Sequence, residues 1–222
     1  MALSWETLAK DIVFNKKTWL ALGVASFAGS ALYVAYRLHE IAKRQRMLRE
    51  APEKRVLVLG LDGAGKSSLL QHMNSGDSAS ALQPTNGFSV ISIQNEGVAL
   101  NIWEVGGAEG VRSYWENFLQ GTELLIFVVD SIDEDRFTVA KEELTKLLAD
   151  QRLKGVPLVV VANKQDQAGA KQGSEICKAL GVEPDWNDRD VYIIETHTSE
   201  NSASLEEIER LKNMMRTLWP KD

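Results

Sequence analysis

Beyond Glu53, short apolar runs alternate with longer stretches in which apolar residues recur every three or four positions. Short runs bounded by turn residues indicate strands, and the longer pattern indicates amphipathic helices. Their alternation is typical of an α/β fold with a doubly wound, mostly parallel sheet. Six strands are predicted, at Val56–Leu59, Phe88–Ile93, Val98–Val105, Leu124–Val129, Leu158–Ala162 and Val191–Ile194.

The second and third strands are joined by Gln94-Asn95-Glu96-Gly97, a turn sequence that predicts one antiparallel hairpin at the edge of the sheet. Helices are predicted directly after the loop at residues 60–67, and at Val111–Gln120, Arg136–Gln151, Lys171–Leu180 and Leu205–Trp219. The apolar residues of the last helix share one face, which indicates packing against the sheet.

A different pattern precedes the α/β domain. The run from Thr18 to Tyr36 contains no charged residue. As a helix rising about 1.5 Å per residue, this run would span about 28 Å, close to the hydrocarbon core of a bilayer. Trp19 at one edge and Tyr33 with Tyr36 at the other are placed as interfacial aromatics. The run predicts a transmembrane helix; the alternatives are a cleaved signal peptide, whose apolar core is usually shorter, and a buried core helix.

Charge divides the chain further. Residues 37–55 carry seven Lys and Arg against three Glu, whereas residues 56–222 carry 15 against 26. The larger positive charge follows the apolar run, which predicts that the C-terminal side is cytosolic. The basic segment favours an anionic membrane surface, with a solvated helix as the alternative, and the acidic domain argues against nucleic-acid binding. We divide the chain into an N-terminal segment (1–17), a transmembrane helix (18–36), a basic helical stalk (37–53) and the α/β domain (54–222).

Residues 60–67, Gly-Leu-Asp-Gly-Ala-Gly-Lys-Ser, match the P-loop pattern G-x-x-x-x-G-K-S and directly follow the first predicted strand. Glycines allow backbone N–H groups to turn toward the β-phosphate of a nucleotide. Lys66 reaches the β- and γ-oxygens, and the Ser67 hydroxyl is a Mg²⁺ ligand. The following helix adds the positive end of its dipole to the anion site. The chain is therefore predicted to bind a nucleoside triphosphate with Mg²⁺.

Asn163-Lys164-Gln165-Asp166 directly follows the apolar strand at Leu158–Ala162. It is thus expected at the carboxyl edge of the sheet, where ligands of open α/β folds bind. Asp166 can accept hydrogen bonds from both N1–H and the exocyclic amine of guanine. Asn163 can reach N7, and the Lys164 stem can cover the ring face. Adenine would leave the carboxylate unpaired, which favours GTP over ATP.

Five motifs together resemble those of ADP-ribosylation-factor-like proteins, the Arf/Arl branch of the small GTPases. They are Gly60–Ser67, Pro84-Thr85-x-Gly87-Phe88, Trp103-Glu104-Val105-Gly106-Gly107, Phe127-Val128-Val129-Asp130-Ser131 and Asn163–Asp166. The resemblance covers Arg55 to Trp219. It implies a P-loop small-GTPase domain that switches between GTP- and GDP-bound forms.

The resemblance also assigns roles. Thr85 of switch I would complete the Mg²⁺ coordination begun by Ser67, and Glu104 would act on the metal indirectly. The Gly107 backbone N–H would bind the γ-phosphate, and the hairpin from Phe88 to Val105 would be the interswitch that slides in register. The backbone of Thr198 would touch the base. The full nucleotide-binding set expected is Gly60, Asp62, Gly63, Ala64, Gly65, Lys66, Ser67, Ser68, Thr85, Gly107, Asn163, Lys164, Asp166 and Thr198.

Three residues depart from the family pattern. Ala2 replaces the glycine that family members myristoylate, so the predicted transmembrane helix would make membrane attachment constitutive. Glu104 replaces an aspartate and is one methylene longer on the Mg²⁺ side. Ala108 replaces the glutamine that orients the attacking water. Glu109 is the candidate substitute, and no arginine finger is identifiable from the sequence, although a partner could supply one.

These departures leave two hypotheses for function. The first is a slowly hydrolysing GTPase switch that recruits effectors and is served by an exchange factor and a GTPase-activating protein. The second is a GTP-loaded membrane scaffold with negligible turnover. An ATPase or kinase is disfavoured by Asn163 and Asp166. The short anchor with basic flanks suits the mitochondrial outer membrane or the endoplasmic reticulum.

Overall fold

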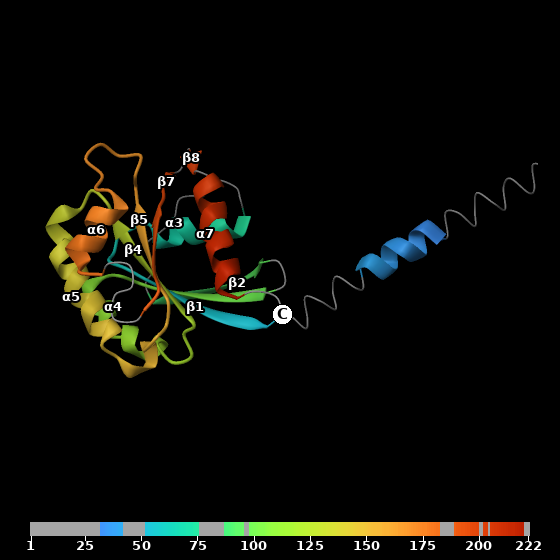
Figure 1. Cartoon of the computed structure of the whole chain (residues 1–222), viewed down its shortest axis with the longest axis horizontal. Helices are drawn as coiled ribbons and strands as arrows, with labels where there is room; N and C mark the ends of the chain where they lie inside the picture. Colours follow the sequence, from blue (N-terminus) through green and yellow to red (C-terminus); the bar gives the residue numbers. More distant parts are fainter. Residues whose placement is uncertain are drawn as a thin grey trace, which may run out of the picture. The chain divides into compact units, whose positions relative to one another are not determined.

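Six strands form one sheet in the computed structural model of the chain, in the order β2-β3-β1-β4-β5-β6 (Figure 1). They are β1 (Glu53–Leu59), β2 (Phe88–Asn95), β3 (Val98–Val105), β4 (Leu124–Asp130), β5 (Leu158–Asn163) and β6 (Val191–Glu195). Only β2 and β3 pair antiparallel, and the other neighbours are parallel. The predicted fold class and its edge hairpin are confirmed.

The structure describes residues 32–41, 52–75, 87–95, 98–182, 189–199, 202–203 and 205–219. The chain divides into two units, residues 1–50 and 51–222. The second unit contains the sheet and its helices. In the first unit, residues 32–41 are helical and exposed.

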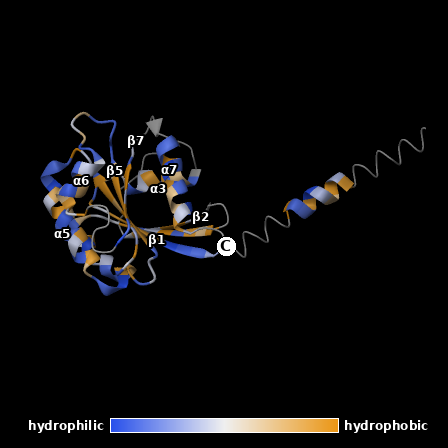
Figure 2. Ribbon diagram, viewed as in Figure 1, coloured by the Kyte–Doolittle hydropathy of each residue, from blue (hydrophilic) through white to orange (hydrophobic). Residues whose placement is uncertain are grey.

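Helices cover both faces of the sheet. α5 (Phe137–Leu148) and α6 (Gly173–Leu180) lie on one face, and α3 (Lys66–Ser75) and α7 (Leu205–Leu218) lie on the other (Figure 1). A second, two-stranded sheet pairs β7 (Thr198–Ser199) with β8 (Ser202–Ala203). The helices show apolar and polar faces, while the central strands are mostly apolar, except for the polar start of β1 (Figure 2). This difference is expected because a parallel strand between two helical layers is buried on both sides.

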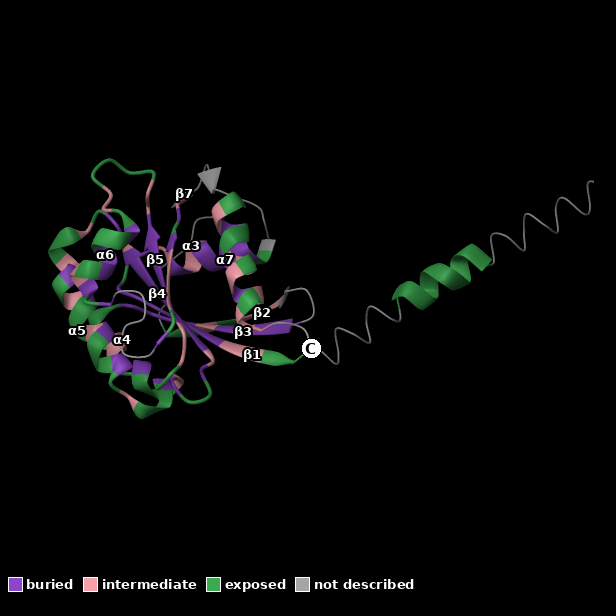
Figure 3. Cartoon of the chain, in the orientation of Figure 1, coloured by how far each residue is buried: buried purple, intermediate pink, exposed green. Residues whose placement is uncertain are grey.

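Successive side chains of each strand point to opposite faces of the sheet and pack into two hydrophobic cores. On β1, Leu57 and Leu59 join the core beneath α5 and α6, whereas Val56 and Val58 join the core beneath α3 and α7. All four side chains are fully buried, as are their neighbours on β4 (Figure 3). Each such side chain contributes about 1.5–3 kcal/mol of transfer free energy. The two cores hold the carboxyl ends of the strands, where the motif residues lie, in fixed register.

β3 has the predicted bounds, and the other five strands of the sheet are longer than predicted. β1 begins at Glu53 and is already paired there with Ala99 of β3. In the hairpin, the pairing of β2 and β3 runs on to Asn95 opposite Val98. Gln94 and Asn95 therefore belong to a strand and not to the predicted four-residue turn. Polar residues at strand ends carry no apolar pattern, but their backbone groups still extend the ladder.

The predicted helix at Val111–Gln120 is wrong. The segment forms a four-residue helix, α4 (Glu109–Arg112), and a 3-10 turn, η1 (Trp115–Phe118). The Trp115 indole N–H is buried and donates a 2.8 Å hydrogen bond to the carbonyl of Gly106. This tertiary contact draws the segment against the preceding loop and prevents one continuous helix. Elsewhere, the 3-10 turns η2 (Glu134–Arg136) and η3 (Gln151–Leu153) flank α5, so the predicted helix at Arg136–Gln151 is shorter than expected.

Among the described residues, no helix is both long enough and apolar enough to cross a membrane. The predicted transmembrane run, residues 18–36, lies outside the described residues except for 32–36. The predicted segment 1–17 also lies outside them, as does most of the stalk at 37–53.

Candidate nucleotide-binding site

The P-loop connects β1 to α3 at the carboxyl end of the sheet. Gly60 has φ +145°, and a Cβ there would lie 2.2 Å from the backbone oxygen of Val128 on β4. Only glycine fits a chain that passes this close to a neighbouring strand. Gly63 and Gly65 also have positive φ, and Ala64 is buried. The predicted strand–loop–helix context of the motif is confirmed.

Lys66, the first residue of α3, is buried among backbone carbonyls. Its Nζ donates to the oxygens of Gly60 and Leu61, each at 2.9 Å. Burial lowers the pKa of Lys66 to about 8, although the carboxylates of Glu104 and Asp62 act to raise it. The ammonium is thus poorly solvated and directed into the loop, which suits it to an anionic phosphate.

Oxygen ligands gather beside the lysine. The Ser67 hydroxyl donates to Glu104 Oε1, and the Ser89 hydroxyl donates to Glu104 Oε2 at 3.2 Å. Glu104 is buried on β3, directly opposite Ser89 of β2. A hydroxyl next to a buried carboxylate is a hard oxygen donor set that fits Mg²⁺. Glu104, which is one methylene longer than the family's aspartate, reaches the Ser67 hydroxyl. Thr85, the predicted switch I ligand, lies outside the described residues.

Switch II, residues 106–108, directly follows β3 and places Gly107 against the P-loop. A Cβ on Gly107 would lie 2.2 Å from Gly60 O and 2.4 Å from Asp62 N. The preceding residue, Gly106, donates its N–H to Gly87 O at 2.8 Å. Glycine is thus required at position 107 by close backbone approach, and the backbone at this position adjoins the phosphate-binding loop.

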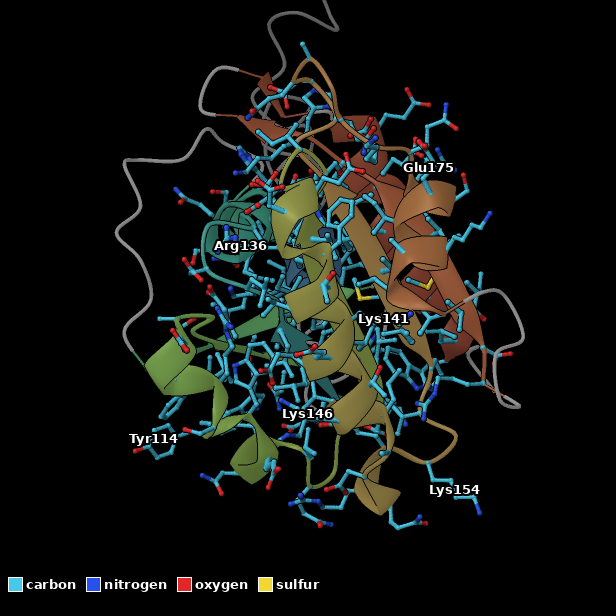
Figure 4. The ribbon with its side chains drawn as sticks, turned by 90° about the vertical axis from the view of Figure 1, so that its left-hand side faces the viewer. Tyr114, Arg136, Lys141, Lys146, Lys154 and Glu175 are labelled. Carbon is cyan, nitrogen blue, oxygen red and sulfur yellow. The ribbon has the colours of Figure 1, made fainter. Side chains whose placement is uncertain are left out.

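Two arginines meet at Asp62 of the P-loop. Arg136 Nη1 lies 3.1 Å and Arg112 Nη2 lies 3.3 Å from Asp62 Oδ1. Partial burial opposes ionisation of Asp62, but the charge of Arg136, a backbone N–H and Arg112 outweigh it and lower the pKa of the carboxyl. Figure 4 shows Arg136, the residue before α5, at the amino end of that helix and on the side of α3. The P-loop is thereby tied to α5 and to switch II.

The base-recognition motif follows β5. Asn163 is fully buried: its Nδ2 donates to Ala64 O at 2.9 Å, and its Oδ1 accepts from Thr196 Oγ1 at 3.0 Å. Asn163 therefore links the P-loop to the end of β6. Lys164 has φ +68°, a conformation uncommon for a side chain of this kind, and its Nζ lies 2.5 Å from Asp130 Oδ2. This ion pair fixes the lysine stem.

The remaining predicted residues occupy the same edge of the sheet. Asp166 is exposed in the turn after Lys164, and Ser68 is half-buried in the first turn of α3. Thr198 begins β7, directly after the loop at the carboxyl end of β6; its side chain lies outside the described part. The neighbouring His197 N–H donates to Glu207 Oε2 at 3.1 Å.

Ala108 and Glu109 follow Gly107 and are both exposed, at the start of α4. A methyl side chain cannot orient a water molecule, whereas the Glu109 carboxylate in principle can. Glu109 lies in the first turn of the short helix, one position further than the family glutamine.

Some residues that support the site were not among the predicted binding residues. They are Thr196, which holds Asn163; Asp130, which holds Lys164; Ser89, which donates to Glu104; and Arg112 and Arg136, which meet at Asp62. Asp130 and Asn163 are paired in the β4–β5 register, and Thr196 is the residue after β6. Asp130 stands in the motif Phe127–Ser131, and Thr196 lies just after a predicted strand, but no sequence pattern marked the two arginines.

A phosphate-binding loop after β1 and a base-recognition turn after β5 define a P-loop nucleotide-binding protein of the doubly wound class. Residues 41–215 match the ADP-ribosylation factor family. The chain belongs to this family, and it is therefore a small GTPase, a GTP-binding switch.

Individual relatives agree with this assignment. The chain is 44% identical over 130 residues to ADP-ribosylation factor-like protein 3 of Chlamydomonas reinhardtii, covering 59% of this chain and 73% of the relative. It is 41% identical over 139 residues to ADP-ribosylation factor-like protein 2 of Drosophila melanogaster, covering 63% and 75%. It is 36% identical over 171 residues to ADP-ribosylation factor-like protein 1 of Caenorhabditis elegans, covering 77% and 94%.

A solved structure is also similar. It is the Arl6 BBS3 small GTPase from Trypanosoma brucei with the bound nucleotide analogue GppNp. It superposes with a TM-score of 0.65 at 27% sequence identity, covering 74% of this chain and 98% of that chain.

Proposed function

We propose that this protein is a membrane-anchored Arf-like switch that binds GTP well and hydrolyses it slowly without a partner. The observation that carries the proposal is the contrast between two adjacent residues. Gly107 lies against the P-loop, close to where a γ-phosphate would bind, while Ala108 beside it has only a methyl side chain. The binding groups of switch II are present and the water-orienting group is replaced.

Within this proposal, the phosphates of GTP are held by the P-loop backbone, Lys66 and the dipole of α3. Mg²⁺ would be held by Ser67 and Thr85, with Glu104 acting indirectly. The ion would supply positive charge that neutralises the phosphate oxygens. The guanine is held by Asp166, Lys164 and the backbone at Thr198, and Asn163 supports both loops through its bonds to Ala64 and Thr196.

Hydrolysis needs two contributions, charge stabilisation and positioning of the attacking water. Lys66, Mg²⁺ and the Gly107 N–H provide the first. Ala108 cannot provide the second, so the intrinsic rate is low and a GTPase-activating partner is the source of fast turnover. The alternative, a GTP-loaded scaffold with negligible turnover, differs only in lacking such a partner.

Membrane attachment is proposed from the uncharged run at residues 18–36 and its basic flank. The described part of this region, residues 32–41, is a helix with exposed Leu32 and Tyr33. A transmembrane helix does not leave the bilayer on GTP hydrolysis, so switching would control effector contact and not membrane residence. With the GTPase domain in the cytosol, the mitochondrial outer membrane or endoplasmic reticulum is the proposed location.

Two surfaces of this chain beside switch II suit the binding of partner proteins. Phe88 and Val90 are exposed on the edge strand β2, and Phe88 stacks on Trp103 of β3 at 5.7 Å between ring centroids. On the other side, a groove of about 360 Å³ runs between α4–η1 and α5, with Trp115 and Leu147 in its lining. Tyr114, between the lining residues Ser113 and Trp115, points away from the domain (Figure 4). We propose that effectors, exchange factors and GTPase-activating proteins use these surfaces.

Single-turnover GTP hydrolysis by the detergent-solubilised full chain tests the proposal. Ala108→Gln restores the water-orienting side chain, so it should raise the intrinsic rate while GTP affinity stays nearly constant, because this group acts on the transition state. Glu109→Gln is the matched variant. A wild-type rate equal to that of Ala108→Gln, and lost in Glu109→Gln, would show that Glu109 positions the water instead.

A further inference from the structure

Arg112 makes two contacts at the centre of the site. Its Nε donates to the carbonyl of Gly107 at 2.8 Å, and its Nη2 lies 3.3 Å from Asp62 Oδ1. The side chain is only 12% exposed. One guanidinium therefore joins switch II to the P-loop across the position at which both meet.

Asp62 does not need this arginine as a counter-ion. Arg136 already pairs with the same oxygen and also donates to the Asp62 carbonyl at 3.2 Å. Of these two arginines, only Arg112 donates to Gly107 O. Loss of Arg112 is therefore expected to disturb switch II more than the P-loop.

Two side chains fix the orientation of the Gly107 peptide groups. Trp115 Nε1 donates to Gly106 O at 2.8 Å, and in a trans peptide the Gly107 N–H points opposite to that carbonyl. Arg112 holds the next carbonyl, that of Gly107 itself. Both side chains come from the segment after switch II, so this segment fixes the direction of the Gly107 N–H, which points away from Trp115.

The charge of Arg112 lies beside the phosphate-binding loop, because its Nη2 is 3.3 Å from Asp62 Oδ1 of that loop. A cation held at this position favours an added anion. Fixed in place by Asp62, this charge is preorganised for a phosphate.

We propose that Arg112 is a positioning residue for the γ-phosphate: it holds Gly107 in its donating orientation and adds positive charge on that side of the P-loop. The proposal rests on the proposed GTP/GDP switch and specifies how the chain distinguishes the two nucleotides. It predicts that loss of Arg112 weakens binding of a triphosphate more than binding of GDP, because only the triphosphate meets the Gly107 N–H.

The experiment compares the dissociation constants of GDP and of the non-hydrolysable analogue GppNp for the full chain in detergent micelles with Mg²⁺. In Arg112→Gln, the preference for GppNp over GDP should fall by about tenfold, equivalent to about 1.4 kcal/mol. Arg112→Lys keeps the charge but cannot make both contacts, so its preference should lie between those of the wild type and the glutamine variant.

Two further variants separate this role from general support of the fold. Arg136→Gln loses a contact to Asp62 but none to Gly107, so it should change both affinities equally. Arg152→Gln, which breaks an exposed pair with Asp150, should change neither. Retained GDP binding shows that each variant is folded. If Arg112→Gln does not fold, the ratio of GppNp affinity to GDP affinity in Arg112→Lys decides the question.

The proposal is overturned if the ratio of the two affinities in the Arg112 variants equals that of the wild type, whether both affinities fall together or neither changes. Failure of the proposed function looks different: the unmodified chain would then hydrolyse GTP as fast as Ala108→Gln, whatever the ratio of the two affinities.

Discussion

Asn163 and Ala64 join the two halves of the nucleotide site, although they lie 99 positions apart in the chain. The Asn163 amide donates a 2.9 Å hydrogen bond to the Ala64 carbonyl, and both residues are buried. The loop that binds phosphate and the loop that binds the base are therefore held as one unit before any ligand contact is considered. Thr196 extends the link to the end of β6.

We expect Asn163→Ala to destabilise the fold itself. The substitution leaves the Ala64 carbonyl and the Thr196 hydroxyl buried without this partner, at about 1–3 kcal/mol for each group. Urea unfolding of nucleotide-free protein measures the loss. Thr196→Val removes one of the two bonds and should cost less, and exposed Asn117→Ala is the control. A loss in Asn163→Ala no larger than that in Asn117→Ala would mean that the link does not stabilise the fold.

The sheet could be predicted because its strands are short runs of buried apolar residues. All six were located, and their errors are at the polar ends, where residues such as Gln94 and Asn95 join the ladder through backbone groups alone. The P-loop and the base motif could be predicted because each is contiguous in the sequence and its spacing has a direct chemical reason.

The segment after switch II could not be predicted in this way. Its structure depends on Trp115 reaching Gly106 and on Arg112 reaching Asp62, contacts that require the folded sheet. Local periodicity favours one helix there, and the tertiary hydrogen bonds override it. For the same reason, no sequence pattern indicated that Arg112 lies at the phosphate site, or that Thr196 supports Asn163.

Guanine specificity should depend on Asp166. Asp166→Asn exchanges one acceptor oxygen for a donor that faces the guanine amine, which should weaken GTP binding by at least about 1–3 kcal/mol. Competition with a fluorescent guanine nucleotide measures this loss. Asp190→Asn, at the amino end of β6 and thus at the opposite edge of the sheet, serves as the control. Equal affinity of the unmodified protein for ATP and GTP would exclude the assigned role.

Membrane retention should be independent of nucleotide. The uncharged run at residues 18–36 is expected to keep the full chain in the pellet after carbonate extraction, whether it is loaded with GppNp or GDP. Deletion of residues 18–36 should release the protein into the supernatant. Replacing Lys10 and Lys16 by Gln leaves the apolar run intact and serves as the control. Release of the intact chain on GDP loading would instead indicate a reversible attachment.

Nucleotide affinity should fall as the pH rises above about 8. Burial lowers the pKa of Lys66 to about 8 in the protein, so the ammonium begins to lose its proton there. Bound phosphate stabilises the charged form and raises the pKa of Lys66, which means that binding takes up a proton in this range. Affinity is then constant below the lower pKa and declines by up to about tenfold per pH unit between the two pKa values.

Calorimetry in two buffers of different ionisation enthalpy measures the proton uptake directly. Lys66→Arg, whose guanidinium remains charged throughout, should show neither the decline nor the uptake. If unmodified protein binds GDP with the same affinity from about pH 7 to pH 9.5, the Lys66 ammonium is not destabilised by burial and its pKa lies near the ordinary value of about 10.4.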